Sequence, residues 1–375
     1  MRPMLRTAVV ALLVCTGAAT LQGQASDALY THWAGYTGFQ FQSYSISVSP
    51  ATKSSEWAIP VVMVAPLGDR MSADLTTHYA NAKVTDASGE HTLSGLTDTQ
   101  LRLLYTLNRD RAVVSLSINL PTGKHTLTSD QFLAYTVLGT NYLSFPVADF
   151  GTAFGATAGV AFATPAGGWN LGVSGAIRYS GSYVPLDTTP PTTYKPGIEF
   201  RGRLGADRLV GQSSRLLVGL TASTFSNDQL TGSGSLGSGS LAPGLRLIGD
   251  AGWVSAIGSN TLSISVWDYY RGKGTFQDTI TTNSENVLNA EARFAIPAST
   301  QVTIQPLVGV RTWSPGQNGG TYLMGGLAAR FGLSDQFTAN LEGRYSSGKA
   351  LQQVGTAQLV SFTGASVQVM LQYQH

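Results

Sequence analysis

The sequence predicts an all-β fold, a single antiparallel transmembrane β-barrel of roughly 14–16 strands with short periplasmic turns and longer extracellular loops. Segments of about 10–13 residues, long enough to cross a bilayer when tilted, alternate apolar and polar side chains. Short and long connections follow one another in turn along the chain. Charged residues make up 12% of the chain, which is about half of the content of ordinary soluble proteins.

Residues 1–25 are predicted to be a cleavable secretory signal peptide. Arg2 and Arg6 form a positive start, an apolar run follows, and small residues lead to a cleavage site after Ala25. The apolar run is too short for a transmembrane helix. Cys15 lies well inside this run, which does not favour a lipoprotein cysteine. The predicted mature chain has no cysteine, so a continuous sheet is expected to supply its stability instead of disulfides.

The predicted mature chain is about neutral, with 21 basic and 21 acidic residues once Arg2 and Arg6 are left out. Without a basic excess we expect no nucleic-acid partner. Residues 26–38 are predicted to form a short periplasmic N-terminal segment, and residues 39–375 the barrel. The predicted location is the bacterial outer membrane, with its lipid as a partner.

The strand candidates come in pairs joined by short turns. They are 39–48, 56–66, 71–84, 97–107, 112–120, 151–164, 169–180, 198–210, 215–226, 244–256, 260–271, 285–296, 301–313, 320–332, 337–346 and 363–373. The longer connections are 85–96, 121–150, 181–197, 227–243, 272–284, 314–319 and 347–362. The count falls to 14 without the first segment and the 347–373 region, which have the weakest patterns.

The two faces of the strand candidates differ in polarity. Between residues 112 and 120, Val114, Leu116 and Ile118 share one face, while Ser115 and Ser117 share the other. In a soluble sandwich the apolar face would need a partner sheet. In a barrel it meets lipid and the polar face lines the lumen. Closure is then required, because an open edge in hydrocarbon would leave backbone groups without hydrogen bonds.

Charged side chains on the polar faces are the candidates for lining the lumen and for selectivity. They are Arg102, Arg178, Glu199, Arg201, Arg203, Arg246, Glu291, Arg293, Arg311, Glu342 and Arg344. One interpretation is a network of cross-strand ion pairs that orders the wall. The other is a charged constriction that selects solutes. The near-balance of positive and negative charges argues against strong anion selectivity.

The predicted loop 121–150 contains more apolar residues than a water-exposed loop should. Phe132, Tyr135, Tyr142 and Phe145 are its candidate contacts for a substrate. In one interpretation the loop folds over the barrel mouth, with a short helix from Ser129. In the other it folds inward, narrows the channel and offers an apolar surface to a hydrophobic solute.

The C-terminal strand alternates Val367, Val369, Leu371 and Tyr373 with polar residues. This pattern resembles the terminal signal that the barrel assembly machinery recognises, although the chain ends in His375 and not at an aromatic residue. The assembly machinery is therefore an expected partner. The oligomeric state stays open.

Other site chemistry finds little support in the sequence. The five histidines show no metal-ligand spacing, so no metal site and no cofactor are predicted. The GSGSLG run at 232–237 matches the GxGxxG pattern of dinucleotide-binding loops. No helix start follows it, so the sequence does not predict a dinucleotide site there. No serine is paired with a histidine in a recognisable motif, so no catalytic residues and no enzyme activity are expected.

Three short motifs resemble those of the meta-pathway phenol degradation-like outer-membrane proteins. They are Leu67–Arg70, Ser94–Asp98 and Leu120–Gly123, and the FGLSDQ turn at 331–336 echoes the first of them. Leu67 replaces the more usual Tyr, and Thr97 departs from the second motif. The match covers about a fifth of the chain. Family members are often treated as relatives of long-chain fatty acid transporter barrels, although too few residues precede the first strand here for an N-terminal plug.

The resemblance implies a barrel that admits small, hydrophobic or aromatic molecules, and it supplies no catalytic residues. The leading functional interpretation is therefore passive passage of such a solute. The alternative is a structural or receptor-type barrel that its own loop plugs.

Overall fold

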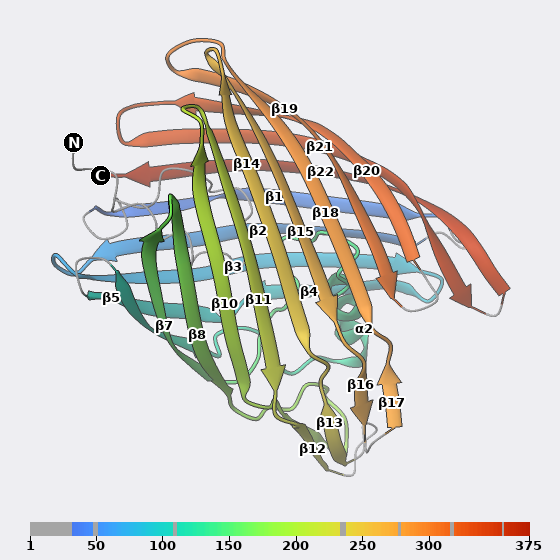
Figure 1. Cartoon of the computed structure of the whole chain (residues 1–375). Coiled ribbons are helices and arrows are strands. Elements are labelled where there is room, and N and C mark those ends of the chain that lie inside the picture. Colours follow the sequence, from blue (N-terminus) through green and yellow to red (C-terminus); the bar gives the residue numbers. More distant parts are fainter. Residues whose placement is uncertain are drawn as a thin grey trace.

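The computed structural model describes residues 32–47, 52–107, 111–232, 238–276, 279–315, 319–354 and 356–375. It confirms a closed antiparallel transmembrane barrel, with 16 strands and a single short helix within the described residues (Figure 1). The predicted signal peptide lies outside these residues. Closure joins β1 (Ala34–Ile46) to β22 (Thr356–Gln374), in a register that runs from Ala34 opposite Gln374 to Ile46 opposite Phe362.

The remaining strands follow one another around the ring in sequence order, and each pairs antiparallel with its neighbours. They are β2 (Thr52–Pro66), β3 (Met71–Asp86), β4 (Gly89–Leu96) with β5 (Thr99–Leu107), β6 (Ala112–Leu120), β7 (Gly155–Ala166), β8 (Trp169–Ser180), β10 (Glu199–Val210), β11 (Ser214–Phe225), β14 (Arg246–Ile257), β15 (Asn260–Arg271), β18 (Glu285–Pro297), β19 (Val302–Pro315), β20 (Gly319–Gly332) and β21 (Phe337–Val354). Ala34, where β1 begins, and the C-terminus lie at the end of the barrel that carries the short turns, the turn end (Figure 1). The opposite end is the loop end.

Several strands continue further than their sequence patterns predict. β3 and β4 extend as a hairpin through the predicted loop 85–96, and β21 and β22 do so through the predicted loop 347–362. β1 begins at Ala34, before the predicted start at residue 39. A strand outside the hydrocarbon layer needs no apolar face, so these parts lack the alternation that marks a bilayer crossing.

β4 and β5 together complete one strand of the barrel, since both pair with β3. Tyr79 faces Leu96 and Thr76 faces Gln100, so the β4–β5 side carries one residue more than β3 between these pairs. This is a β-bulge, which bends the strand and re-aims a side chain. It lies at Asp98, whose carboxylate bonds to the segment inside the barrel.

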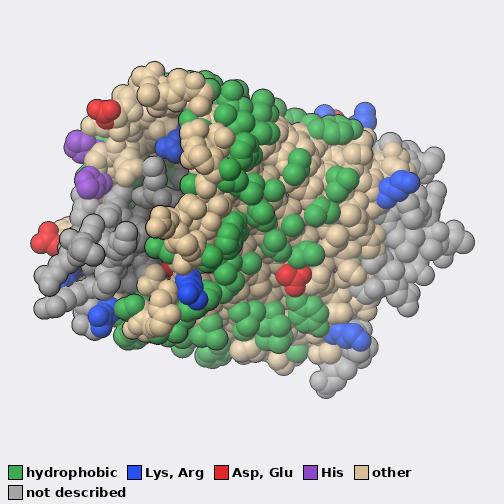
Figure 2. Space-filling model, turned by 45° about the horizontal axis from the view of Figure 1, so that its top comes forward, with side chains coloured by type: hydrophobic (Ala, Val, Ile, Leu, Met, Phe, Trp, Pro, Cys, Tyr) green, Lys and Arg blue, Asp and Glu red, His purple; other side chains and the backbone are tan. Residues whose placement is uncertain are grey.

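The outward-facing side chains of the barrel are apolar. Exposed examples are Leu103, Val114, Leu116, Ile177, Phe200, Leu204, Leu323 and Leu341. Figure 2 shows hydrophobic side chains spread over the visible wall, with most of the charged ones toward its two ends. An apolar surface of this extent is compatible with lipid, and the polar residues between these positions face the lumen. Among the residues that the structure describes, no helix is long and apolar enough to cross a membrane.

Three of the predicted longer connections, 181–197, 227–243 and 272–284, contain a second, smaller antiparallel sheet at the loop end. Its strands are β9 (Thr192–Lys195), β12 (Asp228–Gly232), β13 (Gly239–Ala242), β16 (Gly274–Phe276) and β17 (Thr279–Thr282). These strands are too short to show a period-2 pattern.

Candidate functional site: the lumen and its inner segment

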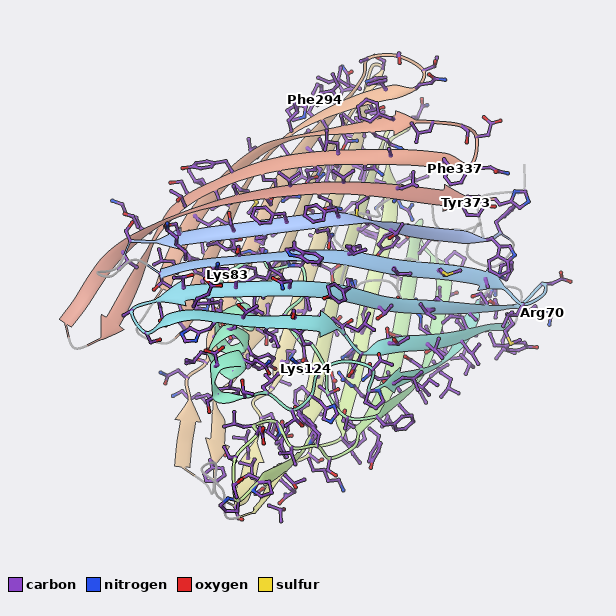
Figure 3. The ribbon with its side chains drawn as sticks, turned by 180° about the vertical axis from the view of Figure 1, so that it is seen from behind. Arg70, Lys83, Lys124, Phe294, Phe337 and Tyr373 are labelled. Atoms are coloured by element: carbon purple, nitrogen blue, oxygen red, sulfur yellow. The ribbon has the colours of Figure 1, made fainter. Side chains whose placement is uncertain are left out.

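The connection between β6 and β7, residues 121–154, lies inside the barrel and is called the inner segment here. It contains α2 (Ser129–Leu138), which begins where the sequence predicts a helix (Figure 3). Thr128 caps α2: its side chain accepts a hydrogen bond from the backbone N–H of Gln131, whose side chain accepts one in return from the backbone of Thr128. The segment thus folds inward, as the second interpretation of the loop expects.

α2 packs against a part of the inner wall that is built from small apolar residues. Ala58 on β2 and Ala80 and Ala82 on β3 are fully buried, and Ala134 and Leu138 of α2 belong to the same cluster. Alanine side chains leave the space between wall and helix that close packing requires. Phe132 and Tyr135, two of the predicted substrate contacts, stack on each other at a ring distance of 6.1 Å beside this cluster. Burial raises the pKa of Tyr135 to about 12, so its hydroxyl stays protonated at neutral pH.

A histidine fixes the start of α2 to the wall. Nδ1 of His91 on β4 lies 2.5 Å from Oδ1 of Asp130, and its Nε2 lies 2.9 Å from Oγ of Ser88. The outward neighbours Glu90 and Thr92 are polar and exposed, which puts this part of β4 beyond the hydrocarbon layer. The hydrogen bond with Asp130 raises the pKa of His91, because it stabilises the protonated imidazole.

Asp98 holds both ends of the inner segment. Its Oδ1 accepts a hydrogen bond from the backbone N–H of Gly123 at 3.1 Å, and its Oδ2 accepts one from the backbone N–H of Thr152 at 2.8 Å. Asn119 on β6 donates to the same Oδ2 at 2.7 Å. Asp98 was not among the predicted site residues, although it stands in the Ser94–Asp98 motif.

The second half of the inner segment packs against the adjacent part of the wall, between β18 and β1, where it joins an aromatic cluster. The ring of Tyr142 stacks on Trp313 of β19 at 5.2 Å. It meets the rings of Tyr322 on β20 and Phe362 on β22 edge-on, at 5.4 and 5.2 Å. Phe145 packs edge-on against Tyr44 of β1 at 5.3 Å. Of the four predicted substrate contacts, Phe132 and Tyr135 therefore pack with the alanine-lined cluster and Tyr142 with the aromatic cluster. Phe145 packs against both.

Polar contacts hold this second half in place. Nδ2 of Asn141 donates to Oε2 of Glu285 on β18 at 2.9 Å, and the backbone N–H of Ser144 donates to the hydroxyl of Tyr44 at 3.1 Å. Glu285 also accepts a hydrogen bond from Trp313 Nε1 at 2.8 Å. Because Asn141 and Ser144 are both bonded to the wall, Tyr142 between them is held in place.

Glu56 on β2 is a buried carboxyl group that sequence reasoning missed. Its side chain is 1% exposed. Within the described residues, neither carboxyl oxygen makes a hydrogen bond of ordinary length and angle, although the backbone N–H of Val147 in the inner segment faces the carboxyl group. A buried carboxylate without a well-formed hydrogen bond costs free energy, and the alternating pattern of β2 gave no sign that this lumenal position would be covered by the inner segment.

The predicted lumenal charges are mostly joined in ion pairs. Arg102 contacts Asp74 at 2.7 Å, Arg201 contacts Glu199 at 2.8 Å, and Arg203 contacts Asp250 at 2.7 Å. Arg178 lies opposite Glu199 in the β8–β10 register. The guanidinium groups of Arg246 and Arg311 lie over aromatic rings, 5.0 Å from Phe225 and from Trp267 respectively.

Four of these charges form a quartet that spans two intervening strands. Arg293 contacts Glu291 at 2.5 Å and Glu342 at 2.7 Å, while Arg344 contacts Glu291 at 2.7 Å and also Glu342. Glu291 and Arg293 lie on β18, and Glu342 and Arg344 on β21. Between them, β19 and β20 carry Gly309 opposite Glu291 and Gly326 opposite Arg344. Because glycine has no side chain, the long side chains can meet over these two strands.

The described residues contain no group of three or more His, Cys, Asp or Glu side chains that could hold a metal ion.

No protein-family model and no curated protein sequence matches this chain. It is similar to a FadL homologue from Pseudomonas aeruginosa, with 10% identity over 92% of this chain and 90% of that one, and a TM-score of 0.44. An anion-selective porin from Comamonas acidovorans is 12% identical over 92% and 98% of the two chains, with a TM-score of 0.41. An outer membrane channel from Pseudomonas putida F1 is 10% identical over 92% of this chain and 96% of that one, with a TM-score of 0.38.

Identities this low do not transfer a substrate, so function has to be inferred from the residues of this chain. The resemblance to the meta-pathway phenol degradation-like proteins stays a prediction.

Proposed function

We propose that this chain is an outer-membrane channel for passive passage of small hydrophobic or aromatic molecules, and that the inner segment narrows its lumen. The observation that carries the proposal is that the ring of Tyr142 packs among the rings of Trp313, Tyr322 and Phe362. A ring from a mobile solute could make the same stacked and edge-on contacts as the ring of Tyr142, each worth about 0.5–1.5 kcal/mol.

The charges of the lumen support a channel for weakly charged solutes. Arginine and carboxylate side chains are paired at contact distance in the quartet and at Arg203. Paired charges leave little net field to attract an ion of one sign. The aromatic cluster is then the feature that distinguishes solutes.

The proposal includes the bacterial outer membrane as the location, the barrel assembly machinery as a partner and the absence of catalysis. The predicted signal peptide and the closed barrel support the location. The alternating C-terminal strand, which forms β22, supports the partner.

The second candidate is a plugged barrel with a structural or receptor role. The bonds of Asp98 to both ends of the inner segment, and of Asn141 to Glu285, favour a segment that stays in place. A fixed plug would let nothing pass.

Single-channel conductance in planar bilayers separates the two candidates. A variant that lacks residues 128–146 removes α2 and the aromatic anchors while keeping Gly123, Thr152 and their bonds to Asp98. A channel predicts measurable wild-type conductance that favours aromatic solutes, and a larger conductance without that preference in the deletion variant. A silent wild type with a conducting deletion variant would support the plugged barrel. Equal conductance in both would contradict a narrowing role for the inner segment.

A further inference from the structure

The outer wall of the barrel carries a row of aromatic rings toward the loop end. Phe39 on β1, Trp57 on β2 and Tyr79 on β3 follow one another, with ring distances of 6.3 Å and 5.6 Å. Phe39 and Tyr79 are exposed on the lipid-facing side. Aromatic side chains gather where hydrocarbon meets the headgroups of a bilayer. This row therefore marks the depth of the lipid headgroups on β1 to β3.

Directly beyond the row, the same outward faces become polar and basic. A cavity of about 340 Å³ opens there between β22, β1, β2 and β3. Its lining includes two lysines and several hydroxyl groups, namely Lys53, Lys83, Ser43, Ser45, Ser55 and Thr363. Figure 3 shows Lys83 near the end of the barrel opposite the turn at Arg70. The cavity thus lies at headgroup depth, on the outside of the barrel.

The two lysines lie close enough together for both ammonium groups to contact the same ligand group. Lys53 faces Thr85 and Ser55 faces Lys83 in the β2–β3 register, so the lysines are diagonal neighbours on one face, a separation of roughly 7–8 Å or somewhat less between Cβ atoms. Lys83 also contacts Glu90 at 2.6 Å, with about half of each side chain exposed (47% and 53%). An ion pair this exposed is weak and can be exchanged for a stronger partner. Ammonium and hydroxyl donors together suit the oxygens of a phosphate.

We propose that this cavity binds the phosphate group of a membrane lipid in the leaflet at the loop end. The lipid's acyl chains would lie against the apolar wall on the hydrocarbon side of the aromatic row, and its phosphate would contact Lys53, Lys83 and the neighbouring hydroxyls. A free phosphate lacks the acyl chains and should bind far more weakly. The site is on the outer wall and is independent of any passage through the lumen.

The test is native mass spectrometry of the full mature barrel in detergent, titrated with dioleoyl phosphatidic acid. Dioleoylglycerol, which has the same chains and no phosphate, and inorganic phosphate are the comparison ligands. We expect one high-affinity phosphatidic acid, no comparable binding of dioleoylglycerol, and no displacement by an equal concentration of inorganic phosphate. The double variant Lys53→Gln/Lys83→Gln should bind the lipid about 30-fold more weakly.

The matched control is Lys195→Gln/Lys273→Gln, which removes two exposed lysines elsewhere at the loop end. It should bind like the wild type, and Glu90→Gln should bind more tightly because it frees Lys83. Unchanged binding in the Lys53/Lys83 variant, an equal loss in the control, or equal binding of dioleoylglycerol would overturn the proposal. Displacement by equimolar inorganic phosphate would show a small-anion site instead. If the double variant fails to fold, Lys53→Gln alone and Glu90→Gln must still move affinity in opposite directions.

Discussion

The carboxylate of Asp98 accepts a hydrogen bond from the backbone N–H of Gly123, 25 residues further along the chain. Two of the three motifs that carry the family resemblance therefore meet in space. Gly123 has to be a glycine, because a Cβ there would lie 1.9 Å from the carbonyl oxygen of Phe150 and 2.7 Å from the backbone nitrogen of Asp98. The two motifs together form the attachment point of the inner segment.

Asp98→Ala should release both ends of the inner segment. The hydrogen bonds of its carboxylate to Gly123, Thr152 and Asn119 are charge-assisted, and each contributes about 1.5–3 kcal/mol. We expect trypsin to cleave the folded barrel after Lys124 much faster in this variant, as followed by mass spectrometry of the fragments. Asp74→Ala is the control, because the partner of this lumenal carboxylate among the described residues is Arg102 on the wall and not the inner segment. Equal cleavage of both variants and the wild type would contradict the role of Asp98.

Tyr142→Ala should loosen the second half of the inner segment. The substitution removes three ring contacts, each worth about 0.5–1.5 kcal/mol. Mean single-channel conductance is expected to rise, with more frequent open events. Tyr142→Phe keeps the ring and should behave like the wild type, and Tyr179→Ala removes a lipid-facing ring without an effect. A conductance that does not change in Tyr142→Ala would speak against anchoring by this ring.

The contact between His91 and Asp130 should weaken as pH rises. The folded-state pKa of His91 lies above its ordinary value of 6.5. The contribution of the protonated His91 to stability is therefore complete below pH 6.5, and it is lost as pH rises through the raised folded-state pKa. Hydrogen exchange of the α2 amides, followed by mass spectrometry, should show lower protection above that pH in the wild type. His91→Gln should lose this step, and a step that persists in the variant would assign it to another group.

The charge quartet should control ion selectivity once its balance is broken. Arg293→Gln/Arg344→Gln leaves Glu291 and Glu342 without their guanidinium partners. The reversal potential in a KCl gradient is expected to shift toward cation preference, because the two carboxylates then act as an uncompensated negative site. Removing one charge of each sign with Glu342→Gln/Arg344→Gln should leave the potential near the wild-type value. Similar shifts in both double variants would show that local rearrangement, not charge, is measured.

Replacing Glu56 with an apolar residue of similar size should stabilise the barrel. Glu56→Met removes a buried carboxyl group that makes no hydrogen bond of ordinary geometry within the described residues. The free energy of unfolding is expected to rise by about 1–3 kcal/mol, as measured by urea titration of the folded band on gels. Glu90→Met, at an exposed position, should change it little. A destabilised Glu56→Met barrel would indicate that the carboxylate has a role in the folded state.

The barrel itself could be predicted from the sequence because bilayer crossing imposes a simple rule on every strand. In β6, Val114 and Leu116 are exposed on the outside, and Ser117 is buried on the inside, as their alternation predicts. The charged residues of the polar faces also meet as pairs on the wall. What these pairs do for a solute stays a prediction.

The inner segment could be recognised as unusual but not located. Its aromatic residues indicate that the segment is buried, but they do not indicate which strands of the barrel it packs against. The receiving wall is marked only by Ala58, Ala80 and Ala82, and alanine is also common on lumenal faces that nothing covers. Contacts such as Asn141 with Glu285 join residues 144 positions apart, and no local pattern encodes them.

The bulge at Thr97 and Asp98 sets which side chains of this strand point into the barrel. Side chains of a strand point alternately to its two faces, and the extra residue is why odd-numbered residues such as Leu93 are buried in β4 and even-numbered ones such as Leu104 in β5. Deleting Asp98 would leave equal numbers of residues on the two strands, so that β4 and β5 would keep their pairing with β3 while the inner segment loses its attachment point. The loss of one codon at the bulge therefore spares the wall, whereas the same loss inside β5 would turn the side chains beyond it to the opposite face.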